Sequence, residues 1–202
     1  QSHLESVQAD LKGLGSTNSR SYVCDVTDLT AISTTAQQII TDFGTDLIGL
    51  VNNAGIWQKK APLENIPDAE IDTVITTDLT GLIHFTKAFL PHFKTVSEAA
   101  VINISSRSGI TAHAGQAVYT AAKWGVKGFT EVLKVDLVGT NIHVSGIYQG
   151  GTNTAMFNKA GEAFSPEKLA GFIPAESLAE VIATMLALPP QIRLSEVHVE
   201  NR

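Results

Sequence analysis

The chain has 202 residues, of which 44% are hydrophobic and 17% charged, and we expect one globular domain over residues 1–202. This composition excludes a disordered tail, a collagen-like repeat and a coiled coil. Fourteen basic residues against twenty acidic ones give a net charge of −6, so we expect neither nucleic acid nor an anionic membrane as a partner.

The cysteine and histidine content indicates a reducing environment. The single cysteine, Cys24, cannot form a disulfide within the chain, and the six histidines have no cysteine or carboxylate neighbours at metal-ligand spacing. No apolar run reaches the roughly 20 residues that span a bilayer. We therefore expect a cytoplasmic protein without a structural metal.

The first part of the chain alternates helical and strand patterns. Apolar residues at helical spacing predict a helix over 4–14, and residues 21–24 follow as a short strand. Asp28 is suited to cap a second helix, which Gly44 ends. Residues 47–51 are apolar on both faces, which predicts a central strand of a sheet.

The remainder continues the alternation, with one long irregular stretch. The expected elements are a helix over 67–93 interrupted near 78–81, a strand over 100–104, a helix over 116–138, a strand over 141–147, a helix over 175–187 and a strand over 194–199. Residues 148–173 are rich in glycine and polar residues, and a connection of that length is typical of a binding loop. The predicted fold class is α/β, with a doubly wound parallel sheet.

Three groups of polar residues stand where open α/β sheets bind their ligands. The segment Asn52 to Gly55 offers amides and a close backbone approach, although a plain Asn-Gly turn also explains it. Ser106 follows the third predicted strand and can donate a hydrogen bond to a substrate oxygen, although serines also simply end strands. Tyr119 and Lys123 lie one helical turn apart, so the ammonium can lower the pKa of the phenol; an exposed aromatic beside a lysine is the plain alternative.

In order and spacing, Asn52-Asn53-Ala54-Gly55, Asn103-Ile104-Ser105-Ser106 and Tyr119-x-x-x-Lys123 together resemble the short-chain dehydrogenase/reductase family. The resemblance implies a Rossmann-like fold, NAD or NADP as cofactor, and hydride transfer between nicotinamide and a small-molecule alcohol or carbonyl substrate. It implies Tyr119 as acid/base, Lys123 as the residue that lowers its pKa and holds the nicotinamide ribose, and Ser106 as the residue that orients the reacting oxygen. The cofactor-binding residues that it implies are Asp25, Val26, Asn53, Ala54, Gly55, Tyr119, Lys123, Gly150, Thr152 and Thr154.

Two features depart from the family pattern. No Gly-x-x-x-Gly-x-Gly turn precedes the first helix, so we expect the N-terminal βαβ unit with its Gly-rich turn to be absent from the chain as given. Asp78 stands where the family usually has an asparagine that supports the catalytic lysine. Its carboxylate either adds negative charge near Lys123 or points to solvent, and the sequence leaves both open.

The predicted function is that of an NAD(P)-dependent oxidoreductase. We expect a homodimer or homotetramer, because the helices corresponding to 79–95 and 116–138 pair with their symmetry mates in the resembling family. Two alternatives stay open: a catalytically silent cofactor-binding or scaffold homologue, and a lyase or epimerase on the same fold. Phe157, Phe164 and Phe172 are expected either to shape the substrate pocket or to anchor their own loop.

Overall fold

The computed structural model describes residues 2–189 and 191–201. Its helices and strands, in chain order, are α1 (Ser2–Gly13), α2 (Leu29–Phe43), β1 (Gly49–Asn52), α3 (Asp68–Ile75), α4 (Gly81–Phe93), β2 (Ala99–Ile104), α5 (Ala117–Asp136), β3 (Ile142–Gln149), β4 (Thr152–Asn153), α6 (Met156–Lys159), α7 (Pro166–Ala170), β5 (Ile173–Pro174), α8 (Ala175–Ala187) and β6 (Glu196–Val199). A π-helical turn over Thr76–Thr80 joins α3 to α4, and a turn of 3-10 helix over Arg107–Gly109 follows β2.

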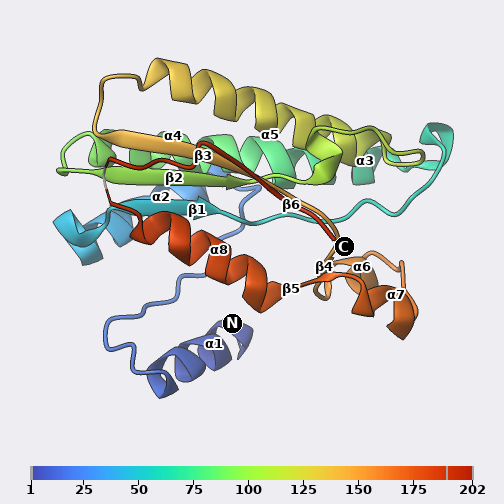
Figure 1. The fold of residues 1–202 in the computed structure, drawn as a ribbon, viewed down its shortest axis with the longest axis horizontal. Coiled ribbons are helices and arrows are strands. Elements are labelled where there is room, and N and C mark those ends of the chain that lie inside the picture. Colours follow the sequence, from blue (N-terminus) through green and yellow to red (C-terminus); the bar gives the residue numbers. More distant parts are fainter. Residues whose placement is uncertain (1, 190, 202) are drawn as a thin grey trace.

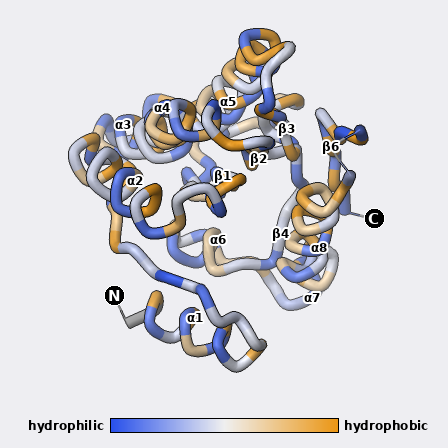
Figure 2. Tube along the Cα trace, turned by 90° about the vertical axis from the view of Figure 1, so that its left-hand side faces the viewer, coloured by the Kyte–Doolittle hydropathy of each residue, from blue (hydrophilic) through white to orange (hydrophobic). Residues whose placement is uncertain are grey.

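Four parallel strands form the main sheet, in the order β1-β2-β3-β6. Helices α4 and α5 lie over one face and α8 over the other (Figure 1). Figure 2 shows α1 set apart from these layers, as Figure 1 does. The α/β fold with a doubly wound parallel sheet, predicted from the alternation of patterns, is confirmed.

Each face of the sheet carries its own hydrophobic core, because successive strand side chains point to opposite faces. One core lies beneath α4 and α5 and includes Phe89, Phe93, Val101, Leu133 and Val144. The other lies beneath α8 and includes Ile102, Ile104, Ile147, Ile173 and Leu178. These two cores fix the strand ends, from which the loops of the candidate site emerge.

Two expectations about strands are wrong. Residues 21–24 form no strand, because no described strand lies beside them to complete the hydrogen bonds that a strand requires; Val23 is 72% exposed. Strand β1 lies at the edge of the described sheet and pairs only with β2. The apolar residues of β1 do not indicate a central position in the sheet. They are apolar because both faces of the strand are packed: Leu50 packs in one core and Val51 in the other.

The predicted helix boundaries are confirmed where capping chemistry marked them. The Asp28 carboxylate accepts hydrogen bonds from the backbone N–H groups of Thr30 at 2.8 Å and Ala31 at 3.1 Å, which begins α2. Gly44 ends that helix with a φ of 50°, a conformation that favours glycine. The interruption expected near 78–81 is the π-helical turn over Thr76–Thr80.

The expected irregular stretch after β3 contains two short helices and two short strands. We call residues 150–174 the lid segment; it comprises β4, α6, α7 and β5, and Thr152 of β4 pairs with Ile173 of β5. It lies at the end of the sheet where β3 and β6 finish (Figure 1). Across residues 2–189 and 191–201, no helix combines the length and hydrophobicity needed to cross a bilayer.

Candidate active site

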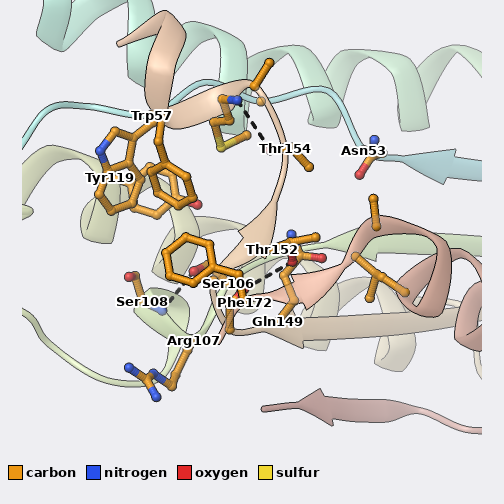
Figure 3. Close-up of a pocket in the computed structure, with 18 of the residues that line it drawn as sticks. Asn53, Trp57, Ser106, Arg107, Ser108, Tyr119, Gln149, Thr152, Thr154 and Phe172 are labelled. Carbon is orange, nitrogen blue, oxygen red and sulfur yellow. Dashed lines mark hydrogen bonds between the residues drawn. The ribbon is translucent and has the colours of Figure 1, made fainter. Parts of the chain in front are cut away.

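A cavity of about 930 Å³ opens at the carboxyl ends of β1, β2 and β3. Its walls come from the loop after β1, the 3-10 turn after β2, the start of α5 and the lid segment, as Figure 3 shows for Asn53, Ser106, Tyr119 and Thr152. Cavities of this size and position are typical of small-molecule sites in open α/β sheets. The three groups of polar residues predicted from the sequence therefore each contribute residues to one cavity.

Tyr119 and Lys123 are both almost fully buried, at 5% exposure each, and share one face of α5. The Lys123 ammonium lies 5.5 Å from the centre of the Tyr119 ring. Ser106 is held beside them because its Oγ accepts a hydrogen bond from the Ser108 backbone N–H at 3.1 Å, which begins the 3-10 turn. The structure thus brings together the three residues expected to act on a substrate oxygen.

Charges and burial act on the Tyr119 phenol in opposite directions. Burial raises its pKa above the ordinary value, since an ionised phenolate loses its solvation there, and the Asp78 carboxylate raises it further. The Lys123 ammonium and the Ser106 hydroxyl favour the phenolate and so oppose this rise. The phenol is therefore protonated at neutral pH, and its acidity depends on these three neighbours.

Asp78 resolves the alternative that the sequence left open. It lies on the π-helical turn and is fully buried, with Oδ2 3.2 Å from Lys123 Nζ and Oδ1 accepting the Ile56 backbone N–H at 2.8 Å. Burial raises the pKa of the Asp78 carboxyl, and the nearby ammonium opposes this. Burial disfavours the Lys123 ammonium, yet Tyr119 and Asp78 outweigh it and hold the pKa of Lys123 above its ordinary value.

Two glycines allow the loops to approach these charges closely. A Cβ atom on Gly55 would lie 3.2 Å from Asp78 Oδ2 and 3.4 Å from Lys123 Nζ. A Cβ atom on Gly109 would lie 2.7 Å from the Lys123 carbonyl oxygen, which also accepts a hydrogen bond from Ser105 Oγ at 3.1 Å. Larger residues would displace both loops, so the glycines fix the distance from each loop to α5.

Below the cavity, a buried chain of side-chain hydrogen bonds joins the strands to the helices. Asn52 Nδ2 donates to Asn103 Oδ1 at 2.8 Å and to Thr86 Oγ1 at 2.9 Å, and Asn103 Nδ2 donates to Thr130 Oγ1 at 2.9 Å. These bonds link β1 and β2 to α4 and α5. Satisfied polar networks of this kind hold a core in one arrangement.

Most residues predicted to bind a cofactor line the cavity: Asn53, Ala54, Gly55, Tyr119, Gly150, Thr152 and Thr154. Gln149, at the end of β3, adds a buried Oε1 that has no hydrogen-bond partner among the described residues. Buried acceptors normally have a donor, so this oxygen fits a ligand that carries an N–H group. The cavity's small residues and amide and hydroxyl groups therefore suit a nicotinamide cofactor.

Three predicted cofactor residues do not line the large cavity: Lys123, which lies 5.5 Å from the Tyr119 ring, and Asp25 and Val26, which lie elsewhere. The Asp25 carboxylate is exposed, does not line the large cavity, and accepts hydrogen bonds from the Thr27 N–H and hydroxyl, each at 2.8 Å. These bonds lower the pKa of the Asp25 carboxyl. Val26 lines a smaller cavity of about 150 Å³, which shares Asn53 and Ala54 with the larger one. The structure therefore does not bring Asp25 to the main site.

Sequence reasoning missed Trp57, which forms a wall of the cavity next to Tyr119 (Figure 3). Its ring packs edge-on against Tyr119 at 4.8 Å and against Phe157 at 5.0 Å between centroids. Its Nε1–H donates to the Glu162 carboxylate at 2.8 Å. The one signal in the sequence was an aromatic residue two positions after Gly55. Phe157, Phe164 and Phe172 line the same cavity and also pack edge-on against one another, so they fit both alternatives, a pocket wall and a loop anchor.

The family model for short chain dehydrogenases matches residues 1–164, and the chain belongs to this family. It is 33% identical over 166 residues to the 3-oxoacyl-(acyl-carrier-protein) reductase FabG of Thermotoga maritima, which covers 80% of this chain and 67% of that protein. It is 38% identical over 135 residues to the trans-4-hydroxycyclohexanecarboxylate dehydrogenase of Sinomonas cyclohexanicum, which covers 65% of this chain and 50% of that protein.

Among solved structures, the closed form of serine dehydrogenase complexed with NADP+ is 27% identical to this chain. The two superpose with a TM-score of 0.82, over 95% of this chain and 79% of that one. The chain spans about half the length of several curated relatives that it matches, between 46% and 50%.

Proposed function

We propose that this chain forms the catalytic part of an NAD(P)-dependent oxidoreductase that acts on a small alcohol or carbonyl compound. One observation carries the proposal: Ser106 and Tyr119 line one cavity, and the Lys123 ammonium lies 5.5 Å from the Tyr119 ring, with Tyr119 and Lys123 both almost fully buried. The reductase and dehydrogenase named among the relatives support this reaction class, and the NADP+ complex of serine dehydrogenase supports the cofactor.

The residues that would hold the cofactor come from two loops. Asn53, Ala54 and Gly55 follow β1, and Gly150, Thr152 and Thr154 open the lid segment. The small residues leave backbone groups accessible, and the threonine hydroxyls can donate to an amide or a phosphate oxygen. When bound, the nicotinamide supplies the hydride for carbonyl reduction or accepts it in alcohol oxidation.

The chain's own residues handle the proton. In reduction, the Tyr119 hydroxyl gives its proton to the substrate oxygen, while the Ser106 hydroxyl donates a hydrogen bond to that same oxygen. In oxidation the proton returns to Tyr119, which must first be a phenolate. Lys123 stabilises that phenolate, and Asp78 sets how much of the lysine charge Tyr119 experiences.

The test is cofactor-dependent turnover of a panel of carbonyl compounds, followed by nicotinamide absorbance with NADH and NADPH in turn. The proposal expects turnover by the native chain and its near-complete loss in Tyr119→Phe. Cofactor binding without turnover of any compound would instead identify a silent cofactor-binding homologue.

We further propose that residues 1–202 act as one NAD(P)-binding domain in the cytoplasm and assemble as a homodimer or homotetramer. A stripe on α5 supports the assembly, because Trp124, Val132 and Val135 lie along one side of the helix and are 48%, 59% and 72% exposed. The free Cys24 suits a reducing compartment. Sedimentation at micromolar concentration tests the assembly, and a monomer would contradict it.

A further inference from the structure

The candidate cavity is positively charged, although the chain as a whole is negative. Four cationic side chains line it, Lys60, Arg107, Lys159 and Lys168, and its described lining contains no carboxylate. The chain nevertheless carries twenty acidic residues and a net charge of −6. A cavity lined by one sign of charge concentrates the potential inside it and attracts ligands of the opposite charge.

Three basic groups gather on one wall, and the backbone holds them there. The Ala61 backbone N–H donates to the Gly115 carbonyl at 3.0 Å, which ties the loop carrying Lys60 to the loop carrying His113. Gly115 has a φ of 76°, and a Cβ atom on it would lie 3.3 Å from Lys60 Cβ. Arg107 and Lys60 are close enough to His113 to lower the pKa of its imidazole, together with the larger effect of burial.

This wall adjoins the groups that act on the substrate oxygen. Arg107 directly follows Ser106 in the 3-10 turn, and His113 lines the cavity together with Tyr119. In Figure 3, Arg107 lies on the opposite side of Ser106 from Asn53, which belongs to the expected cofactor set. Arg107 therefore lies away from this part of the expected cofactor set, on a side of the cavity that is left for a substrate.

The cations of this wall are available to a ligand. Within residues 2–189 and 191–201, neither Arg107 nor Lys60 makes an ion pair within 4.0 Å. The nearby Glu162 carboxylate accepts hydrogen bonds from the Trp57 Nε1–H at 2.8 Å and the Lys60 backbone N–H at 3.5 Å, and it makes no ion pair with the Lys60 ammonium within 4.0 Å. A guanidinium and an ammonium with free donors are the groups that proteins use to bind acid groups.

We propose that the substrate of this site is an anion, a carbonyl or alcohol compound whose carboxylate, sulfonate or phosphate group is bound by Arg107, Lys60 and His113. This inference rests on the proposed oxidoreductase function and names its substrate class. The acid group lies on the Arg107 side of the cavity while the reacting oxygen is held by Ser106 and Tyr119. The wall contributes to binding and takes no part in the proton step.

The experiment compares levulinate, a keto acid, with its methyl ester, which keeps the carbonyl and the chain but lacks the charge. We expect kcat/KM for the acid to exceed that for the ester by about tenfold or more, the effect of a charge-assisted hydrogen bond. In a chain carrying both Arg107→Gln and Lys60→Gln the ratio should fall close to one. Lys59→Gln is the matched control, because Lys59 is exposed, adjacent in sequence and outside the cavity.

Three outcomes overturn the inference: a native enzyme that turns over the ester as well as the acid, a preference that survives the double substitution, or an equal loss in Lys59→Gln. The phosphates of the cofactor are the other possible anions. A double variant in which the KM for NADH or NADPH rises while the acid preference stays would assign the cations to the cofactor, and would also overturn it.

A binding measurement separates this inference from the proposed function. The chain has two tryptophans, so Trp124→Phe leaves Trp57 as the reporter of the cavity. If neither compound is turned over, the panel of carbonyl compounds decides the proposed reaction, and binding alone tests the anion site. Quenching by levulinate at lower concentration than by the ester, lost in the double variant, would still support the anion site. Equal quenching by both compounds would refute it.

Discussion

Replacing Asp78 by asparagine tests how the charges at the site are balanced. Asparagine has nearly the same shape, and its amide oxygen can still accept the Ile56 backbone N–H that Asp78 Oδ1 accepts at 2.8 Å. It removes the negative charge 3.2 Å from Lys123 Nζ. The substitution therefore changes the electrostatics of the pair while leaving the local packing in place.

The effect on stability follows from the distance and the burial. Two opposite charges 3.2 Å apart attract by about 5 kcal/mol at an effective dielectric constant of about 20. Breaking a buried pair by removing one partner typically costs about 3–5 kcal/mol. Because the Ile56 hydrogen bond is kept and a buried carboxylate is removed, we expect a loss of about 3 kcal/mol. For a chain of this length, that lowers Tm by about 6–12 °C.

The effect on the pH profile follows from the sign of the Asp78 charge. Oxidation of an alcohol needs the Tyr119 phenolate, so its rate rises with pH through the raised pKa of Tyr119; reduction needs the phenol and falls over the same range. Asp78 raises that pKa, so Asp78→Asn should move both profiles to lower pH. On the rising limb, the oxidation rate should increase about tenfold for each pH unit of the shift.

The assay is the oxidation rate of one alcohol between about pH 6 and pH 10, where the rate still rises toward the raised pKa of Tyr119, with the native chain and the variant side by side. Asp72→Asn is the control, since Asp72 is exposed on α3 and loses the same charge. A profile that moves to higher pH would show that Asp78 acts mainly by keeping Lys123 charged. An unchanged profile would show that its charge does not reach Tyr119, and either result refutes the reasoning.

Three other substitutions have sharp expectations. Tyr119→Phe should lower turnover by at least about 100-fold with little change in Tm, and near-native rates would refute the acid/base role. Asn103→Ala should lower the free energy of unfolding in urea by about 2–3 kcal/mol, because it leaves a buried amide and the Thr130 hydroxyl each short of a partner; a loss below about 0.5 kcal/mol would show that water replaces the bonds. Trp57→Phe removes the donor to Glu162, so the substrate KM should rise several-fold with kcat within about twofold, as steady-state kinetics would measure; an unchanged KM would contradict a role for that bond in holding the lid segment.

Local chemistry made much of the fold predictable. The Asp28 cap and the positive φ of Gly44 each follow from a single residue's preference, and both are present. The interruption expected before Gly81 is present as well. The strand expected at residues 21–24 failed for a non-local reason, because a strand forms only beside a neighbour. The edge position of β1 could not be predicted for a similar reason. Apolar residues on both faces of a strand indicate that other elements pack on both faces, but they do not indicate the order of the strands in the sheet.

The contacts within the site were predictable where both residues lie on the same helix, because their spacing in the sequence then determines whether they meet. Tyr119 and Lys123 lie one helical turn apart, so their proximity follows from helix geometry. The ion pair between Asp78 and Lys123 joins a π-helical turn to α5. No periodicity in the sequence predicts the direction in which the Asp78 side chain points from such a turn. Trp57 reaches Tyr119 from an irregular loop, whose path depends on tertiary packing.

The side-by-side amides of Asn52 and Asn103 also settle the alignment of two strands that their apolar residues leave ambiguous. A shift of β1 along β2 by two residues would keep every apolar side chain on its own face. It would, however, separate the two buried amides, at a cost of about 1–3 kcal/mol for each group left without a partner. The amide pair therefore fixes the positions at which the loops after β1 and β2 begin. It thereby determines the relative positions of Asn53 and Ser106 in the unliganded protein.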